Sequence, residues 1–390
     1  MYVERVQVEN VRGFHGARNV DLTLPGPGWT VIAGRNGSGK TSLLRAIALT
    51  IADTGAAHKL APDPRAWVST GELRARAELY LPGQGVRRIL WDLEVDGDFA
   101  GSRHGVFSAA YGPYRRLSGR ASGRELGSVS PYVTLFDEDA ALSEGVVWLV
   151  EQHLRAFEGK SGAAELKRAA LRVLADGLLP DAYEVQDVDS DGLWVSYQGN
   201  RFPLREMSDG YRTVTALVVD LIRNIHDFYG SVELDQAEGV VLIDEVDAHL
   251  HVSWQKRIGP WFKAHFPKIQ FIVTTHSPYV CQAADPGGLI RLPGPDEQQP
   301  PRVVSEELYE RVAYGSGDDA VLSDLFGLDT PYSPEAVALR EELAELEFKV
   351  ASGQADERMT ARWKELRELL TSSPVARVDE VAQRGEVEDR

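Results

Sequence analysis

Eight residues, Gly34 to Thr41 (GRNGSGKT), restrict what this 390-residue chain can fold into more than any other feature. They fit the pattern G-x-x-x-x-G-K-[ST], in which the glycines let successive backbone N–H groups face one phosphate group. A strand is predicted before this loop, at 29–33, and a helix after it, at 41–51, where apolar residues recur at helical spacing. Because a phosphate-binding unit has this order of elements, we favour it over a glycine-rich turn with a chance lysine.

Two residues at the end of the loop have defined expected roles. Lys40 is placed to reach the β- and γ-phosphates of a nucleotide, and the Thr41 hydroxyl is placed to bind Mg²⁺. Further nucleotide contacts are expected from the rest of the loop and the first helical turn: Asn36, Gly37, Ser38, Gly39 and Ser42.

A second motif, Gly239 to Glu245 (GVVLIDE), is an apolar stretch that ends in two acidic residues. A short, fully apolar strand is typical of the interior of a parallel sheet. It would deliver Asp244 beside the phosphate loop, where the carboxylate can hold Mg²⁺. Glu245 then points to the other side of the strand, placed to orient or deprotonate an attacking water. The alternative is two solvated acids at the end of a strand. The presence of the phosphate loop in the same chain favours the metal-binding interpretation over it.

A third motif, Thr274 to Pro278 (TTHSP), follows the next predicted buried strand. It presents His276 at the same edge, where an imidazole can hydrogen-bond a γ-phosphate oxygen. A structural or solvated histidine is the alternative.

A fourth motif, Met207 to Arg212 (MSDGYR), lies at the start of a predicted helix over 211–229. Ser208 is a natural N-cap, so a simply capped helix is one interpretation. The other is a phosphate bound by the Ser208 hydroxyl and the exposed N–H groups of the helix start. Two phosphate-binding helix starts for one nucleotide are explained if two copies of the chain pair head to tail.

Taken together, these motifs resemble the ABC-type ATPase heads of the RecF/SMC group. GRNGSGKT resembles the Walker A motif, VVLIDE resembles Walker B, MSDGY resembles the signature LSGGQ, and TTHSP resembles the H-loop. The stretch 246–251 (VDAHLH) resembles the D-loop of bacterial AAA-ABC proteins related to OLD and PtuA. The resemblance implies an α/β P-loop NTPase fold: an ABC-ATPase head with a mixed sheet, a small inserted helical and β lobe, and a C-terminal helical hairpin.

The resemblance also implies ATP and Mg²⁺ bound between two heads. Lys40, Glu245 and His276 would be catalytic, Thr41 and Asp244 would hold the metal, Ser208 and Gly210 would act in trans, and Asp247 would lie at the dimer seam. For the pair His249 and His251 we favour helix-end packing over metal binding.

Two departures from the family pattern stand out. Asp209 replaces the first glycine of the signature, and no glutamine occurs between Phe99 and Arg124, so no Q-loop is assigned. The segment 111–116 (YGPYRR) lies in that region and is either a surface loop or a loop that faces nucleotide or DNA.

The spacing of the motifs limits the domain organisation. Long SMC-type arms do not fit between Thr41 and Ser208, so a compact lobe is expected there. We divide the chain into residues 1–98, an ATPase lobe with Walker A; 99–204, an inserted lobe; 205–304, a second ATPase lobe; and 305–390, an acidic helical tail. Within these parts we expect a loop over 99–129, two helices within 140–175, one helix over 254–266, and two tail helices starting at Ser333 with a turn near Gly353.

The net charge of −17 is unevenly distributed. Residues 305–390 contain 21 acidic and 10 basic residues, which suits contacts with other proteins. Residues 99–124 contain no acidic residue but hold the only arginines we would test against DNA: Arg103, Arg115, Arg116, Arg120 and Arg124. The single cysteine, Cys281, cannot form an internal disulfide, and no apolar run is long enough to span a membrane, so a cytoplasmic protein is expected.

Three functions are compatible with these features. The PtuA-like interpretation is an ATPase sensor of an anti-phage defence complex, a homodimer or higher homo-oligomer that controls a separate nuclease or toxin. The second is a RecF-like DNA-repair ATPase that binds duplex DNA. The third is a scaffold that stays locked with ATP and does not turn it over.

Overall fold

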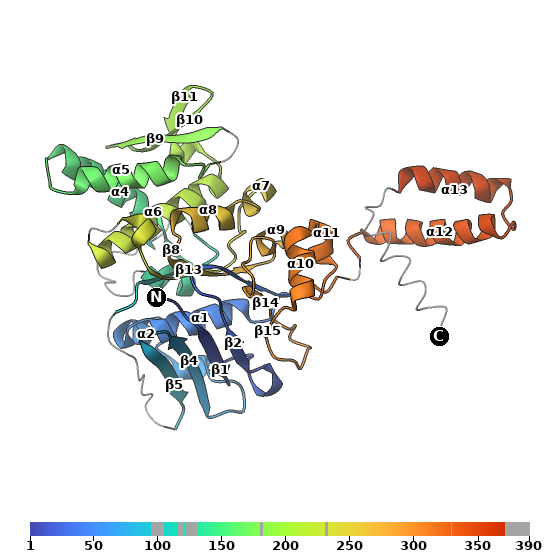
Figure 1. Cartoon of the computed structure of the whole chain (residues 1–390), viewed down its shortest axis with the longest axis horizontal. Coiled ribbons are helices and arrows are strands. Elements are labelled where there is room, and N and C mark those ends of the chain that lie inside the picture. Colours follow the sequence, from blue (N-terminus) through green and yellow to red (C-terminus); the bar gives the residue numbers. More distant parts are fainter. Residues whose placement is uncertain are drawn as a thin grey trace. The chain divides into compact units, whose positions relative to one another are not determined.

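The computed structural model describes residues 1–94, 105–115, 120–121, 131–179, 182–230, 233–328 and 330–370. The chain divides into two compact units, Met1–Tyr314 and Gly315–Arg390. Each unit is described by itself (Figure 1).

A six-stranded sheet forms the centre of the first unit, in the order β15-β14-β3-β13-β12-β6. The neighbours are parallel except for β15, which pairs antiparallel with β14, so the sheet is mixed. Because parallel strands point the same way, the segments that leave their carboxyl ends gather at one edge. The six strands are β3 (Gly28–Ala33), β6 (Ser108–Tyr111), β12 (Gly239–Ile243), β13 (Ile269–Thr275), β14 (Leu289–Arg291) and β15 (Arg302–Val303).

Strand β6 corrects the expectation of a continuous loop over 99–129. It pairs in register with β12, with Val240 opposite Ser108 and Ile243 opposite Tyr111. Ala109 and Ala110 are completely buried. Small residues flanked by Gly, Ser and Arg carry no local strand signal, so the pairing with β12 stabilises this strand rather than its own propensity.

A four-stranded antiparallel sheet, in the order β2-β1-β4-β5, packs against helix α1 (Lys40–Ile51). Its inward residues, such as Val6, Val8 and Leu79, are buried and alternate with polar residues on the other face. In Figure 1 this sheet lies at the opposite end of the first unit from the sheet formed by β9, β10 and β11. The strands are β1 (Arg5–Glu9), β2 (Val20–Thr23), β4 (Arg74–Leu81) and β5 (Gly85–Asp92).

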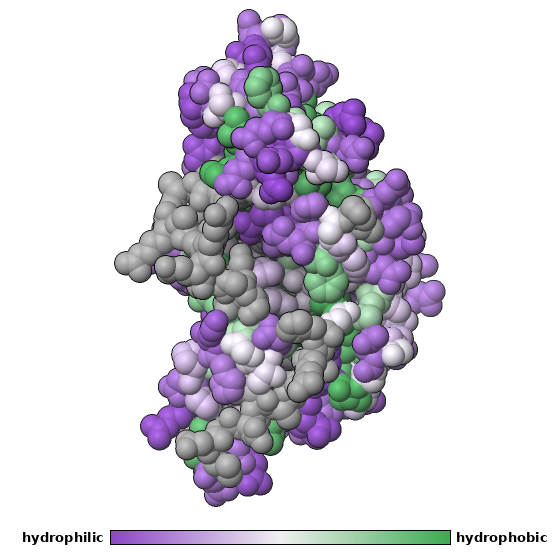
Figure 2. Space-filling view, turned by 90° about the vertical axis from the view of Figure 1, so that its left-hand side faces the viewer, coloured by the Kyte–Doolittle hydropathy of each residue, from purple (hydrophilic) through white to green (hydrophobic). Residues whose placement is uncertain are grey.

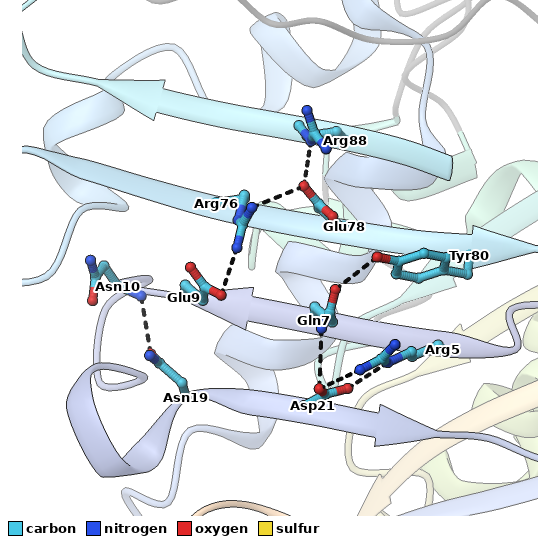
Figure 3. A network of polar contacts seen from close by, with 10 residues as sticks. All are labelled: Arg5, Gln7, Glu9, Asn10, Asn19, Asp21, Arg76, Glu78, Tyr80 and Arg88. Atoms are coloured by element: carbon cyan, nitrogen blue, oxygen red, sulfur yellow. Dashed lines mark hydrogen bonds and ion pairs between the residues drawn. The ribbon is translucent and has the colours of Figure 1, made fainter. Parts of the chain in front are cut away.

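A polar network covers the outer face of this antiparallel sheet (Figure 3). At its centre is Glu78, only 3% exposed, whose Oε1 accepts hydrogen bonds from Arg76 and Arg88 on the same and the neighbouring strand. Arg76 also donates to Glu9 Oε1 at 2.6 Å, which links β4 to β1. Cross-strand pairs of opposite charge stabilise a sheet face that carries polar side chains.

The inserted lobe contains two helices, α4 (Ser143–Phe157) and α5 (Ala163–Ala175), packed against a small antiparallel sheet. The helices break where the sequence predicts, between Gly159 and Gly162, which both have positive φ. The predicted start at residue 140 is wrong, because Ala140–Ala141 form strand β8, paired with β7 (Arg120–Ala121). The small sheet consists of β9 (Tyr183–Asp189), β10 (Gly192–Tyr197) and β11 (Asn200–Pro203).

The longest helix, α6 (Asp209–Tyr229), is buried along its central turns. The single helix expected over 254–266 is instead two, α7 (Val252–Gln255) and α8 (Ile258–His265). Pro260 explains the break, because a proline has no N–H and is tolerated only in the first turn of a helix. Short helices complete the first unit: α2 (Thr54–Leu60), α3 (Val133–Phe136), α9 (Pro278–Cys281) and α10 (Glu306–Tyr314).

The second unit holds the short helix α11 (Gly317–Val321) and the predicted hairpin of α12 (Pro334–Ala351) and α13 (Glu357–Leu369). Ser333 caps α12, and Arg362 of α13 donates to Glu342 of α12 at 2.8 Å. Leu346 and Leu366 are the buried residues of the two helices.

The surface is predominantly polar where Figure 2 shows it, and hydrophobic residues form small patches between hydrophilic ones. Of the helices that the structure describes, none combines the length and the apolar character that a membrane span needs.

We predict that Glu78→Gln lowers the free energy of unfolding by about 1–3 kcal/mol, because two arginines lose their shared buried carboxylate. The matched control is Asp21→Asn, which removes an ion pair to Arg5 from an aspartate that is 52% exposed. The control should cost less than about 1 kcal/mol. Urea denaturation followed by circular dichroism measures both, and equal losses would contradict the role given to Glu78.

Candidate functional site

The phosphate loop connects β3 to α1, and its glycines adopt conformations that other residues rarely take. Gly37 has φ +78° and Gly39 has φ +100°. Gly39 is also the N-cap of α1, so no side chain caps this helix and its first N–H groups stay available to an anion.

Neighbouring atoms leave no room for side chains at two of the glycines. A Cβ on Gly34 would lie 2.7 Å from the carbonyl oxygen of Leu292, and one on Gly39 would lie 2.7 Å from the ring of Phe14. Asn36 and Gly37 are exposed, whereas Ser38 is buried. The loop is therefore packed firmly at both ends and open at its tip.

Lys40 bends back over this loop. Its Nζ donates to the carbonyl oxygens of Gly34 at 2.8 Å and Arg35 at 3.2 Å. Burial lowers the pKa of Lys40, and the carboxylates of Asp244, Glu245 and Asp247 oppose that shift. The ammonium group thus lies near all three acids of the Walker B and D-loop stretch.

Asp244 directly follows β12, and its side chain is completely buried. It accepts hydrogen bonds from Thr41 Oγ1, at 2.7 Å, and from Thr274 Oγ1. Mg²⁺ prefers hard oxygen ligands at about 2.1 Å in octahedral geometry, so adjacent ligands lie about 3 Å apart. The hydroxyl of Thr41 and the carboxylate of Asp244 fit that requirement in both chemistry and spacing.

Glu245 has a left-handed backbone, with φ +45°. Its N–H donates to Thr274 Oγ1 at 2.8 Å, and its carbonyl accepts from Arg115 Nη2 and from Ala248 N. Such a conformation costs about 1–3 kcal/mol in a residue with a side chain and is found mainly at functional sites. Burial, followed by the charges of Asp244 and Asp247, raises the pKa of Glu245, which makes its carboxylate a better base.

His276 follows β13 at the same edge. Burial, and then the positive charge of Lys40, lower the pKa of His276, so its imidazole is mostly neutral at pH 7. Asp247 lies beside it, because Thr275 Oγ1 donates to Asp247 Oδ1. The predicted residues Lys40, Thr41, Asp244, Glu245, Asp247 and His276 therefore gather at one sheet edge, while Ser42 lies in the first turn of α1.

Ser208 and Gly210 lie at the other predicted phosphate site, the start of α6. Ser208 takes the N-cap position, but its hydroxyl makes no capping hydrogen bond. A Cβ on Gly210 would lie 2.2 Å from the carbonyl oxygen of His249, so the helix start packs directly on the D-loop. His251 accepts a hydrogen bond from Ser253 N and caps α7, the helix-end role that the sequence favours for it.

A cavity of about 240 Å³ opens at this helix start. The residues that line it come from α6, the D-loop and α7, and they include Ser208, Gly210, His249 and Trp254. The phosphate loop contributes nothing to that lining. The structure thus gives each head two distinct candidate phosphate sites.

Arg115 corrects one expectation about DNA. It is only 3% exposed and donates to Glu245 O at 2.8 Å, so it lies in the candidate ATP site and not on a surface that DNA can reach. Arg103, Arg116 and Arg124 lie outside the described residues, as does the side chain of Arg120 in β7. DNA contact by these four stays a prediction.

Two further arginines support the phosphate loop and carry no sequence signal that would have revealed them. Buried Arg18 donates to Ser38 O at 3.1 Å and to Pro293 O at 3.2 Å, which fixes the loop against the segment after β14. Arg12 donates to Ser42 Oγ at 3.4 Å and stacks on Trp67.

Comparison with known proteins gives two family matches. A family model described as "AAA domain" matches residues 5–88, and one described as "AAA domain, putative AbiEii toxin, Type IV TA system" matches residues 166–282. The first contains the phosphate loop and the second contains the signature, Walker B, D-loop and H-loop motifs.

Curated relatives agree with these matches. The chain is 28% identical to the Septu protein PtuA of Bacillus mycoides over 71% of its own length, and 30% identical to that of Bacillus thuringiensis over 54%. These alignments cover 38% and 54% of the two relatives, so the chain spans about half of their length or less. It is also 47% identical to the Retron Ec83 probable ATPase of Escherichia coli, over 20% of this chain and 15% of that protein.

The fold matches a solved SMC head, crystallised with the C-winged helix domain of ScpA. The TM-score is 0.50 at 18% identity, and the match covers 79% of this chain and 99% of that one. The predicted fold class, an α/β P-loop ABC-ATPase head with a mixed sheet, is confirmed. By these matches the chain contains regions similar to AAA domains and has the fold of an ABC-type ATPase head, as its resemblance to the RecF, SMC and OLD group implies.

Proposed function

We propose that this chain binds ATP with Mg²⁺ and hydrolyses it between two copies of itself. The single observation that carries the proposal is the convergence of Lys40, Thr41, Asp244 and Glu245 at one sheet edge, beside the uncapped start of α1. A purely structural acid pair would need neither a glycine-rich loop nor an uncapped helix start next to it.

The residues would divide the chemistry among them. Thr41 and Asp244 would hold Mg²⁺, which neutralises charge on the β- and γ-phosphates when it is bound. Glu245 would accept a proton from the water whose oxygen forms the new bond to the γ-phosphorus, while the bond from that phosphorus to the ADP oxygen breaks. Lys40 would stabilise the phosphate charge, and neutral His276 would donate a hydrogen bond to a γ-phosphate oxygen.

The pairing of two copies is supported by the separate cavity at the start of α6. Ser208 and Gly210 line that cavity without any contribution from the phosphate loop of the same chain. In a head-to-tail dimer, each cavity would close over the nucleotide that the other copy holds. Asp247, which lies next to the H-loop, would then be near the seam between the copies.

The biological role that we propose is that of a sensor in an anti-phage defence complex, controlling a separate nuclease or toxin. Its support is the similarity to Septu PtuA proteins and to a retron ATPase. The hairpin of α12 and α13 offers a surface for protein contacts, because Phe348 is 69% exposed on α12, a helix with five acidic and two basic residues.

Two substitutions at the ATP site are expected to differ in effect. Lys40→Ala should abolish ATP binding, because it removes the cation that faces the phosphates. Glu245→Gln should keep ATP binding, lower phosphate release by about 100-fold or more, and trap the dimer. Nucleotide binding, phosphate release and light scattering with ATP measure these outcomes.

The matched control is Lys160→Ala, which removes an exposed lysine far from the loop in sequence and should behave as wild type. If Glu245→Gln with ATP is no more associated than wild type, the dimer proposal is wrong. If wild type releases no phosphate with Mg²⁺, hydrolysis is not its function and the scaffold interpretation replaces it.

The defence role is tested by co-expressing the whole chain with the products of its neighbouring genes. We expect one of them to be a nuclease or toxin that co-purifies with the chain. The Phe348→Asp variant should recover less of this partner, while its own rate of phosphate release from ATP stays unchanged. The absence of any such neighbouring gene would contradict the defence role. Unchanged recovery of the partner with Phe348→Asp would contradict the assignment of this surface.

A further inference from the structure

The segment Tyr111–Arg115 lies directly beside the end of β12. Tyr111 pairs with Ile243 in the central sheet, and its carbonyl accepts a hydrogen bond from Asp244 N at 2.8 Å. A Cβ on Gly112 would lie 2.0 Å from the carbonyl oxygen of Thr134, so only a glycine allows this close packing. The backbone after β6 is thereby held against the Walker B residues.

The same segment is tied to α6 by buried polar groups. Asn224 Nδ2 donates to the hydroxyl of Tyr111 at 3.2 Å and to Asp220 Oδ2 at 2.8 Å. Asp220 also pairs with Arg223 at 2.7 Å. Because α6 begins at the signature motif, this network joins the signature helix to the strand that leads to Arg115.

Arg115 ends the segment with its guanidinium directed at the main chain of Glu245. Its Nη2 donates to Glu245 O at 2.8 Å, and the side chain is almost completely buried. Asp244, Glu245 and Asp247 are the charges that act on it. Among the described residues, Nε of Arg115 has no hydrogen-bond partner.

This contact falls on the strained residue of the site. Glu245 has φ +45°, and the hydrogen bonds that fix its peptide groups come from Thr274, Ala248 and Arg115. Thr274 and Ala248 belong to the sheet edge and the D-loop, whereas Arg115, of these three residues, connects Glu245 to the segment that contacts α6. A buried guanidinium is costly unless charges compensate it, and here three carboxylates offset part of that cost, although burial still lowers the pKa of Arg115.

We propose that Arg115 is a positioning residue that holds the Glu245 main chain, and hence its carboxylate, in the orientation needed for catalysis. The inference rests on the proposed ATP hydrolysis and adds a residue that acts through Glu245. It also gives the segment 111–115 a function in transmitting the position of α6 to the catalytic carboxylate. Of the two interpretations open from the sequence, surface loop or nucleotide-facing loop, the geometry points to the second.

The test separates catalysis from nucleotide binding in the full chain. Arg115→Ala should lower kcat by about 10- to 100-fold, because a misplaced base costs rate and not affinity. KM and the affinity for a non-hydrolysable ATP analogue should stay within about threefold of wild type. Arg115→Lys keeps the charge and one donor, so its kcat should recover to between the alanine variant and wild type.

Arg65→Ala, at an exposed position, is the matched control and should leave kcat unchanged. Thermal unfolding establishes that each variant is folded. If Arg115→Ala does not fold, the Arg115→Lys variant is the test. A kcat of Arg115→Lys at least about threefold below wild type, at unchanged affinity for the analogue, supports the inference. A wild-type kcat of Arg115→Lys overturns it.

Two other results overturn the inference while leaving the proposed function intact. One is a wild-type kcat in folded Arg115→Ala. The other is a loss of analogue binding as large as the loss of kcat, which would make Arg115 a binding residue. Failure of the wild-type chain itself to bind the analogue would instead overturn the proposed function.

Discussion

The buried carboxylate of Asp244 is the interaction on which the rest of the site depends. It directly follows a strand whose residues are all buried, and a charge in that position is costly unless neighbouring groups compensate it. The compensating hydroxyls of Thr41 and Thr274 come from α1 and β13. The nearby cations, Lys40 and Arg115, come from α1 and from the segment after β6. The groups that compensate the Asp244 carboxylate therefore come from the same elements that carry the proposed catalytic residues.

The two candidate phosphate sites of each head are built differently. The phosphate loop is held in place because Gly34 and Gly39 pack closely against Leu292 and Phe14, and because Arg18 donates a hydrogen bond to Ser38 O. The signature site is an open cavity at a helix start whose N-cap hydroxyl makes no capping hydrogen bond. The first site brings Lys40, Thr41 and Asp244 together, whereas the second is lined by Ser208 and Gly210, which we propose contact the nucleotide of a second copy. The network from α6 through Tyr111 to Arg115 connects these two sites within one head.

Much of the fold was predictable because its strongest signals are local. The glycine pattern of the phosphate loop, the apolar run before Asp244, and the heptad-like spacing of the tail helices each reflect neighbouring residues, and the structure has elements at those places. Strand β6 was not predicted because its four residues are stabilised by pairing with β12, which is more than 100 positions away in the chain. The role of Arg115 was missed for the same reason. In the sequence it looks like part of a basic surface loop, but the pairing of β6 with β12 places it beside Glu245. Local sequence does not encode which distant carbonyl or carboxylate an arginine will meet, and this also holds for Arg18.

The central claim is that each ATP site combines the phosphate loop of one copy with the signature helix of another. Mixing two inactive variants tests it most directly: Lys40→Ala, which keeps its signature, and Ser208→Glu, which keeps its phosphate loop but repels phosphate. Each alone should hydrolyse almost no ATP. An equal mixture should recover about a quarter of the wild-type rate, since half of the dimers are mixed and each mixed dimer has one intact site of two. No recovery in a mixture shown to form mixed dimers, or full activity of Ser208→Glu alone, would contradict the account.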